Sequence, residues 1–444
     1  MIKVSSWPDE THFNQTGGFT MNLTQNDKLN QVTADTLIVG VDIGSQTHFA
    51  RAFDWRCFEF TKRVFRFGNT SVGFLSFLRW LEEIKSKTGM KKIIVGCEPT
   101  GCYWLTFQKF LQDHQILLVT VNPYSVKKCK ELDDNSPEKS DLKDPKTIAG
   151  LVKDGRFSTS YLPSGVYAEI REAFVCREQI MKQHVRLSNQ IQGWLQKYFP
   201  EYFECYEKWD STSGLMVLQH APLPQDIIRI GAGGINEIWR NAKVRAAGMA
   251  RATTLMEAAQ NSVGLEGGEA ARIEIWILVN DYIAKAEQLK RLDEYLTEKV
   301  MEVPNVEKLL AIKGVGLSTV IGFVAEVGDI GRFTDPKQIQ KLAGLEITKI
   351  SSGKRKGRPG ISKRGRCKLR KVMFESARAL INWNPAFLDV FLYYRNRERR
   401  PLGSMQAKIA VACKAIRVFY VILQTGCEFD EERFRKDILR PQVA

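Results

Sequence analysis

A stretch near the start of the chain, residues 36–55, combines a continuous apolar run with one acid, Asp42. The run over residues 37–41 is typical of a strand buried on both faces, and a carboxylate at its end is costly unless it is paired, hydrogen-bonded or bound to a metal. A Gly-Ser turn at residues 44–45 and a second β-type run over residues 47–55 predict a hairpin with Asp42 near its tip. Two roles are open for this acid, as a turn cap or as a functional group.

Length and charge narrow the class of protein. A chain of 444 residues exceeds the usual size of a single core, so two or three domains are expected. Lys and Arg number 65 against 50 Asp and Glu, and a net charge of +15 favours a polyanionic partner, with nucleic acid first. No apolar run has the length of a membrane span, and the polar start lacks the apolar segment of a secretion signal. Nine scattered cysteines without a CxxC pair indicate reduced thiols, and we expect a cytoplasmic protein without a membrane partner.

The region after the hairpin alternates strand and helix patterns. We expect a third strand over residues 58–67, an amphipathic helix over 71–85, a buried strand over 92–97, a helix from Gly101 and a strand over 116–121. The strand over 92–97 ends in a second acid, Glu98. This order predicts an α/β domain.

Two further acids, Asp141 and Asp144, lie three residues apart. If the segment is helical, both carboxylates lie on one face. Pro145 instead favours Asp144 as the N-cap of a helix that starts at Pro145, and both interpretations are open. Together with Asp42 and Glu98, these acids have the composition that a two-metal nuclease centre requires. Mg²⁺ or Mn²⁺ fits such oxygen ligands, whereas the five dispersed histidines do not favour zinc.

Several short motifs occur in a fixed order: VGVDIGSQTH at 39–48, EPTG at 98–101, NPYSVKK at 122–128 and Asp-x-x-Asp at 141–144. In this order they resemble the DEDD transposases of Piv-related insertion sequences, known as bridge-RNA-guided recombinases. The resemblance implies an RNase H-like (RuvC-like) domain in which Asp42, Glu98, Asp141 and Asp144 are catalytic and bind Mg²⁺ or Mn²⁺.

The middle of the chain has helical periodicity. Two heptad series, over residues 170–198 and 275–296, predict long helices, and the first series is interrupted by polar Arg177, His184 and Ser188. The helices form either an antiparallel coiled-coil hairpin or two independent core helices. Between them, glycine clusters at 231–234 and 264–268 predict short helices and loops.

The last third contains a GxG turn at Gly314 and Gly316 that is similar to a helix-hairpin-helix, in which glycines let backbone N–H groups approach a phosphate. An ordinary helical turn is the alternative. Residues 351–371 then hold ten cations and no acid, which is typical of a loop along a phosphate backbone or of a solvated basic run. The cations are Lys354, Arg355, Lys356, Arg358, Lys363, Arg364, Arg366, Lys368, Arg370 and Lys371.

The pattern from Ser352 through this basic stretch resembles the signature of the C-terminal transposase domain of the same family. The resemblance implies that Ser352 is a nucleophile, with Ser351 and Ser362 as fallback positions. Without it, a turn or cap serine is the simpler interpretation of Ser352. Residues 383–400 add an aromatic and basic mix that suits nucleic acid or an ordinary surface helix.

We therefore expect an α/β plus α fold: a flexible arm at 1–35, a RuvC-like domain at 36–160, a helical coiled-coil region with a small insertion at 161–303, a helical transposase domain with a helix-hairpin-helix-like element at 304–425, and a tail at 426–444. The expected function is recombination of donor and target DNA through Ser352 and the four acids, with a guide RNA and a homo-oligomer, a dimer of dimers, as the family implies. A hydrolytic RuvC-like nuclease and a non-catalytic nucleic-acid-binding protein are the alternatives.

Overall fold

The computed structural model of the protein describes residues 24–134, 143–244, 247–348, 351–352, 355–356 and 360–439. For 130–134, 351–352, 355–356 and 437–439 it describes the backbone alone. Three residues that carry predictions, Asp141, Lys354 and Arg358, lie outside the described residues. The chain divides into two compact units, one formed by residues 1–163 with 331–335 and the other by 164–330 with 336–444.

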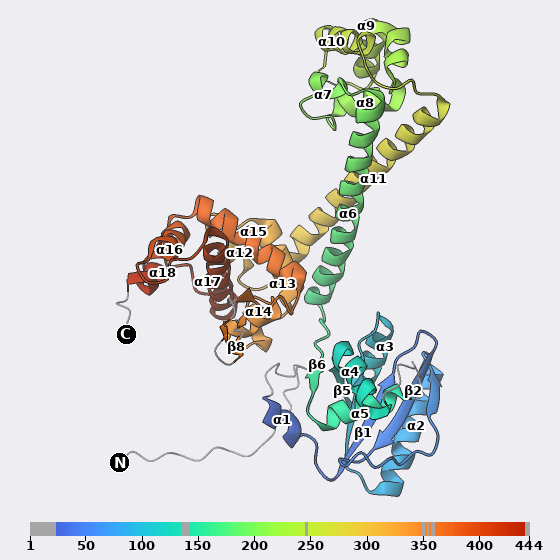
Figure 1. The fold of residues 1–444 in the computed structure, drawn as a ribbon, viewed down its shortest axis with the longest axis vertical. Coiled ribbons are helices and arrows are strands. Elements are labelled where there is room, and N and C mark those ends of the chain that lie inside the picture. Colours follow the sequence, from blue (N-terminus) through green and yellow to red (C-terminus); the bar gives the residue numbers. More distant parts are fainter. Residues whose placement is uncertain are drawn as a thin grey trace. The chain divides into compact units, whose positions relative to one another are not determined.

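The first unit is built on a six-stranded mixed sheet (Figure 1). The strands β1, β4 and β5 run parallel, and the other pairs are antiparallel. The order across the sheet is β3-β2-β1-β4-β5-β6, so the predicted α/β domain is confirmed. The strands are β1 (Thr36–Asp42), β2 (Thr47–Phe53), β3 (Phe65–Gly68), β4 (Lys92–Cys97), β5 (Leu117–Val121) and β6 (Phe157–Thr159).

Helices cover both faces of this sheet. Side chains of a strand alternate between faces, so Val39 and Val41 pack with α2 (Ser71–Thr88) and α3 (Tyr103–Asp113). Ile38 faces the other way, toward α4 (Pro123–Asp134) and α5 (Asp144–Lys153). Because both faces of β1 are covered, the uninterrupted apolar run that the sequence shows is what burial requires.

The expectation of a strand over residues 58–67 is wrong in extent. The strand β3 covers Phe65–Gly68, and the preceding residues contribute one isolated bridge between Phe53 and Glu59. The reason is a turn around Asp54, whose buried carboxylate accepts the backbone N–H groups of Arg56 and Phe58, each at 2.8 Å. Local side-chain hydrogen bonds of this kind compete with a sheet ladder.

In the second unit, two long helices pair in opposite directions: α6 (Val166–Tyr198) and α11 (Glu269–Met301). Near one end, Glu169 lies 3.7 Å from Lys299; further along, the ring of His184 stacks on Tyr282 at 4.1 Å. The guanidinium of Arg177 forms an ion pair with Asp293. Two of the three polar residues that interrupt the heptad series, Arg177 and His184, thus make contacts across the hairpin instead of breaking it.

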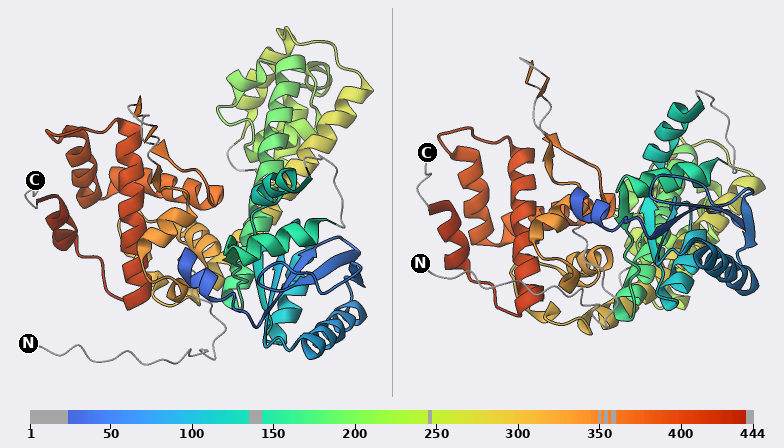
Figure 2. Two further views of the ribbon diagram at one scale, coloured as in Figure 1. Left: turned by 60° about the horizontal axis from the view of Figure 1, so that its bottom comes forward. Right: turned by 90° about the horizontal axis from the view of Figure 1, so that it is seen from below.

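A helical cap closes the end of the hairpin where α6 ends and α11 begins (Figure 2). It comprises α7 (Tyr202–Cys205), α8 (Thr212–His220), α9 (Pro224–Asn241) and α10 (Met249–Gln260), around a core that contains Tyr202 and Trp239. The short helices that the sequence predicted around the glycines at 231–234 are confirmed. These glycines lie inside α9, which kinks at Gly231, where φ is +67°, and resumes because Ile235 and Trp239 are buried.

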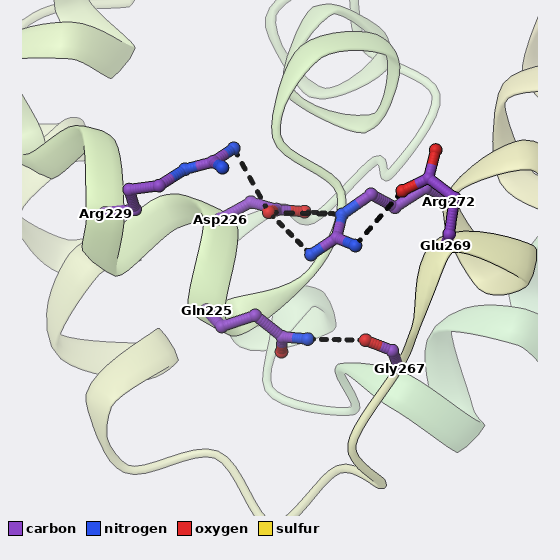
Figure 3. Close-up of polar contacts among 6 residues, drawn as sticks. All are labelled: Gln225, Asp226, Arg229, Gly267, Glu269 and Arg272. Carbon is purple, nitrogen blue, oxygen red and sulfur yellow. Dashed lines mark hydrogen bonds and ion pairs between the residues drawn. The ribbon is translucent and has the colours of Figure 1, made fainter.

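One polar cluster fastens this cap to α11 (Figure 3). The carboxylate of Asp226 is almost fully buried and accepts three hydrogen bonds from the guanidinium of Arg272, at 2.9–3.2 Å. Beside it, the amide of Gln225 donates to the carbonyl of Gly267 at 2.6 Å. Because a buried carboxylate is costly without partners, this cluster fixes the angle at which α9 meets the start of α11.

The remaining helices and four two-residue strands complete the chain. The core here lies among α13, α15 and α17, where Phe323 meets Phe419 edge to face. None of the helices that the structure describes combines the length and apolar composition needed to cross a bilayer. The helices are α12 (Val306–Leu310), α13 (Leu317–Val327), the 3₁₀ helix η1 (Ile330–Arg332), α14 (Pro336–Leu342), α15 (Cys367–Trp383), α16 (Pro385–Asn396), α17 (Ser404–Thr425) and α18 (Glu431–Leu439); the strands are β7 (Ile347–Thr348), β8 (Ser351–Ser352), β9 (Arg355–Lys356) and β10 (Gly360–Ile361).

Candidate active site

Two of the predicted acids end adjacent parallel strands. Asp42 is the last residue of β1, and Glu98 directly follows β4. The register pairs Val41 with Cys97, so the two acids occupy neighbouring positions in strands about 4.8 Å apart. Both continue the alternation that directs Ile38 and Ile94 toward α5. The sheet therefore places Asp42 and Glu98 side by side at its carboxyl edge, on one face.

The helix α5 lies directly on these strands because two glycines make room for it. A Cβ on Gly40 would lie 1.8 Å from the carbonyl oxygen of Pro145, and a Cβ on Gly96 would lie 2.4 Å from Val152 Cγ2. These glycines face each other in the register of β1 and β4. Since Pro145 meets β1 two residues before Asp42, the first turn of α5 lies beside the end of that strand.

Asp144 occupies this first turn and is buried. The predicted N-cap role is wrong in detail: the helix begins at Asp144 itself, Lys143 is the capping residue, and its side chain makes no cap hydrogen bond. An acid in the first turn is stabilised by the partial positive charge of the helix N-terminus. Asp144 is thus held by α5 at the edge where Asp42 and Glu98 end.

The loop after Glu98 has its own constraints. Thr100 donates to Glu98 through its backbone N–H, at 2.8 Å from the carbonyl, and through Oγ1, at 3.4 Å from Oε1. Gly101 has a φ of +60°, which L-residues with side chains rarely adopt. Burial, reinforced by the Glu98 charge, raises the pKa of the neighbouring Cys97 thiol to about 12, so this thiol stays neutral.

Residues that had no assigned role also reach this edge. The parallel strand β5 ends next to Asn122, whose Oδ1 accepts the N–H of Tyr124 at 2.9 Å and so starts α4. The ring of Tyr124 is 69% exposed. In the sequence, only the family resemblance of the motif at 122–128 points to this segment. No local pattern shows that β5 lies beside β4, which is what brings Asn122 to the same sheet edge.

The donor set suits a hard divalent cation, because carboxylate oxygens are the ligands that Mg²⁺ and Mn²⁺ prefer. Within the part of the chain that the structure describes, no three Asp, Glu, His or Cys side chains gather closely enough to hold a metal ion. Asp141, the fourth acid, lies outside that part. What the described residues provide is three carboxylates on elements that meet at one sheet edge.

The predicted serine lies in the second unit, on a segment carried by two strand pairs. The outer pair joins β7 to β10, with Ile361 opposite Ile347 and Gly360 opposite Thr348. The inner pair joins β8 to β9, with Ser351 opposite Lys356 and Ser352 opposite Arg355. Both serines therefore have a cationic residue as cross-strand neighbour.

The stem of this segment, residues 342–346 with 360–370, is closed by backbone hydrogen bonds. They run from Ser362 to Glu346, from Lys363 to Gly344 and from Arg366 to Leu342, with N···O distances of 2.7–3.0 Å. Arg370 adds a hydrogen bond to the carbonyl of Ala343 at 2.9 Å. Arg366 donates to the carbonyl of Glu326 and lies 3.8 Å from its buried carboxylate. Two of the predicted phosphate contacts, Arg366 and Arg370, thus anchor the stem.

Other predicted nucleic-acid contacts lie in varied places. Lys363, Arg364 and Lys371 are exposed, and the Lys368 ammonium lies 5.7 Å from the ring of Phe174 on α6. Of the two turn glycines, Gly316 is exposed at the N-terminus of α13, whereas a Cβ on Gly314 would lie 3.1 Å from the carbonyl oxygen of Ala379. Gly314 therefore allows α15 to pack closely. Gly316 instead leaves the N-terminus of α13 open to a phosphate, because no other group lies within 4 Å of a Cβ built on it.

Two family models match separate parts of the chain. Residues 39–200 match the family model DEDD_Tnp_IS110, described as a transposase, and residues 306–391 match a model described as "Transposase IS116/IS110/IS902 family". The first match contains Asp42, Glu98, Asp141 and Asp144, and the second contains the serine segment. The helical cap and α11 lie between the two matched regions.

The chain is also similar in sequence to curated proteins of insertion elements. The chain is 24% identical over 287 residues to the uncharacterized 44.8 kDa protein of insertion element IS116 from Streptomyces clavuligerus, covering 64% of this chain and 71% of that protein. It is 23% identical over 295 residues to the uncharacterized 43.6 kDa protein of IS110 from Streptomyces coelicolor, covering 66% and 72%. It is 32% identical over 146 residues to the transposase for insertion sequence element IS1111A of Coxiella burnetii, covering 33% and 40%.

Proposed function

The chain belongs to the IS116/IS110/IS902 family of transposases, and from this premise we propose that it cuts and rejoins DNA strands with Ser352 as nucleophile. The observation that carries the proposal is the register of β1 and β4. It places Asp42 beside Glu98 at the sheet edge where α5 brings Asp144. Strand transfer on DNA is the reaction of this family, and acids at such an edge are suited to phosphodiester chemistry.

The carboxylates are proposed to act as metal ligands. Asp42, Glu98, Asp141 and Asp144 would hold Mg²⁺ or Mn²⁺, which when bound would stabilise negative charge on the phosphodiester oxygens. The protein's contribution is to fix the ligands: β1 and β4 set the spacing of two acids, and packing on Gly40 and Gly96 sets the position of α5. Such ligands need no rearrangement during the reaction.

The serine is proposed to form a covalent link to DNA. Its Oγ attacks the phosphorus, an Oγ–P bond forms, the P–O bond to the departing strand breaks, and the hydroxyl proton passes to the departing oxygen. A serine hydroxyl is a weak nucleophile, so nearby positive charge helps as the phosphate becomes more anionic. Arg355, opposite Ser352 in the β8–β9 register, is suited to that role. The phosphoserine bond retains the energy needed for rejoining, so no nucleotide cofactor is required.

Nucleic-acid binding is proposed to depend on the cations that do not anchor the stem. Lys354, Arg355, Lys356, Arg358, Lys363 and Arg364 would contact phosphates, because they flank the serine and carry no acid among them. Gly316 would offer its helix N-terminus to a further phosphate. We also propose that the protein binds a structured guide RNA and assembles as a dimer of dimers. Both parts of the proposal rest on the resemblance of the sequence motifs to the family.

For the fold, we propose that the first unit is RNase H-like of the RuvC type. An antiparallel hairpin, β1–β2, extended by parallel β4 and β5 supports this assignment. We also propose that α6 and α11 act as a coiled-coil linker and that α12, the Gly314–Gly316 turn and α13 act as a helix-hairpin-helix-like element.

The deciding experiment is to trap and map a protein–DNA adduct. The full-length protein, its copurified RNA and a nicked suicide DNA substrate are mixed with Mg²⁺, denatured and digested, and the DNA-linked peptide is sequenced by mass spectrometry. We expect the link on Ser352, and we expect Ser352→Ala to lose it while Ser351→Ala and Ser362→Ala keep it. Cleavage that persists in Ser352→Ala without an adduct would instead support a hydrolytic nuclease.

A further inference from the structure

A cavity of about 740 Å³ lies in the second unit, between α14, α17 and the outer strand pair β7–β10. One face of α17 forms its wall, with Gln406, Ile409, Ala410, Cys413 and Arg417 at helical spacing. Ala410 and Cys413 are small, and their size leaves the space open. The volume is within the range of about 300–1,000 Å³ that ligand sites occupy.

The cavity has two chemically different parts. Its inner surface is apolar, with contributions from Leu345, Leu402 and Ile409. Four cations border it, with Glu346 as the one acid among its described lining residues: Lys337, Lys341, Lys414 and Arg417. An apolar interior with a cationic border suits a ligand that joins a flat apolar group to an anion.

An aromatic ring stands at one side. Tyr394 lines the cavity, and the guanidinium of Arg397 lies 5.6 Å from the centre of its ring. The segment that follows folds back, because the N–H of Leu402 donates to the carbonyl of Tyr394 and Arg397 Nε donates to the carbonyl of Arg400, each at 2.9 Å. The aromatic and basic mix at 383–400 thus places a tyrosine ring at this cavity. Nucleobases stack on such rings, and Arg contacts strengthen the stacking.

The cavity also adjoins the stem of the serine segment. Ile347, Gly360 and Ile361 line it, and these residues form the strand pair β7–β10 from which Ser351 and Ser352 extend. A nucleotide bound in the cavity would therefore contact residues that are only a few positions in the sequence from Ser351 and Ser352.

From these observations we propose that the cavity accepts one unstacked nucleotide of the substrate DNA, its base against Tyr394 and Ile409 and its phosphate at the cationic border. The proposal rests on the proposed function for the choice of DNA. Binding an unstacked base near the break would hold the strand end in place during exchange, and enzymes that act on bases likewise bind a flipped nucleotide in a pocket.

Cys413 offers a test that needs no catalysis. The full-length Ser352→Ala protein is treated with N-ethylmaleimide, alone or with a single-stranded oligodeoxynucleotide, and labelling of each cysteine is quantified by mass spectrometry. Burial raises the pKa of the Cys413 thiol to about 11, so labelling is run at mildly alkaline pH. We expect the oligonucleotide to slow labelling of Cys413 several-fold and to leave exposed Cys427 and Cys176 unchanged. An abasic oligonucleotide of equal length should not protect Cys413.

Equal protection by the abasic strand would overturn the proposal, since it would mean that phosphates alone bind there. Stronger protection by an RNA strand would also overturn it and assign the cavity to RNA. A second measurement uses Ala410→Trp, which fills the cavity, with Val421→Trp as the control at an exposed site on the same helix. By fluorescence anisotropy, we expect Ala410→Trp alone to weaken binding of the base-containing strand about tenfold, to the level of the abasic strand; unchanged binding would contradict the proposal.

The two proposals fail separately. Loss of the Ser352 adduct would leave protection of Cys413 unaffected, because protection is measured in the Ser352→Ala protein. If the oligonucleotide did not protect Cys413 and Ala410→Trp bound DNA normally, the cavity would have no role in the reaction. The proposal for Ser352 would be unaffected.

Discussion

Asp42 and Glu98 each follow a fully buried residue, Val41 and Cys97, whereas Ser351 and Ser352 form the short strand β8 that follows the exposed residues of β7. At the sheet edge, position is set by packing: two glycines admit α5 against β1 and β4. At the serine stem, position is set by backbone hydrogen bonds and by Arg366 and Arg370. The proposed metal ligands thus lie on a rigid core, and the proposed nucleophile lies on a stem held by a few polar contacts that single substitutions can weaken.

The largest effect should come from Asp42→Asn, which removes one proposed metal ligand and leaves the packing intact. Losing several kcal/mol of charge stabilisation corresponds to a fall in strand-transfer rate on the order of 10³-fold. DNA affinity should be unchanged, as measured by electrophoretic mobility shift. Asp113→Asn, an exposed acid at the end of α3, is the control and should retain activity. Full activity of Asp42→Asn would remove this acid from the site.

Next in size, Gly40→Ala tests whether packing sets the sheet edge. The new Cβ would overlap the carbonyl of Pro145, so we expect the free energy of unfolding to fall by about 3 kcal/mol and strand transfer to fall with it. Gly150→Ala, on α5 itself, has no atom within 4 Å of its Cβ and should raise stability by about 0.5–1 kcal/mol. Urea unfolding measures both. Equal behaviour of the two variants would disprove close packing at Gly40.

Arg366→Ala tests the polar anchoring of the serine stem. It removes the cation beside the buried Glu326 carboxylate, and we expect about 2 kcal/mol of destabilisation. Lys371→Ala, exposed on α15, should leave stability unchanged and instead reduce the salt dependence of DNA binding. If Arg366→Ala changed only the salt dependence, Arg366 would be a phosphate contact and not an anchor.

The smallest effect concerns His48 on β2, which is fully buried among Phe67, Phe74 and Phe107. Burial lowers its pKa, against an opposing effect of Asn69. The unfolded chain then binds a proton at about pH 6.5 while the folded protein does not, so stability should fall as pH drops below that value toward the folded pKa. Unfolding curves at pH 5–8 measure this, and His48→Phe should flatten the dependence. If the free energy of unfolding depended on pH in His48→Phe as it does in the unmodified protein, the pH dependence would come from other groups.

Much of the fold followed from local patterns. The apolar run before Asp42 predicted β1, residues 71–85 predicted most of α2, and the heptad series predicted α6 and α11. The prediction failed where a local interaction overrode the pattern, because the carboxylate of Asp54 turns the chain before β3.

For the site, the sequence by itself determined which residues we propose for the chemistry: two acids at the ends of buried strands, an Asp-x-x-Asp pair, and a serine among cations. Only the tertiary structure decided that β1 lies beside β4 in a register that aligns Asp42 with Glu98, that α5 begins at Asp144, and that Arg366 and Arg370 anchor the stem. The reason is physical. Alternation and helical periodicity are properties of neighbouring residues, whereas strand order, register and the partners of long side chains depend on groups far apart in the chain that meet only on packing.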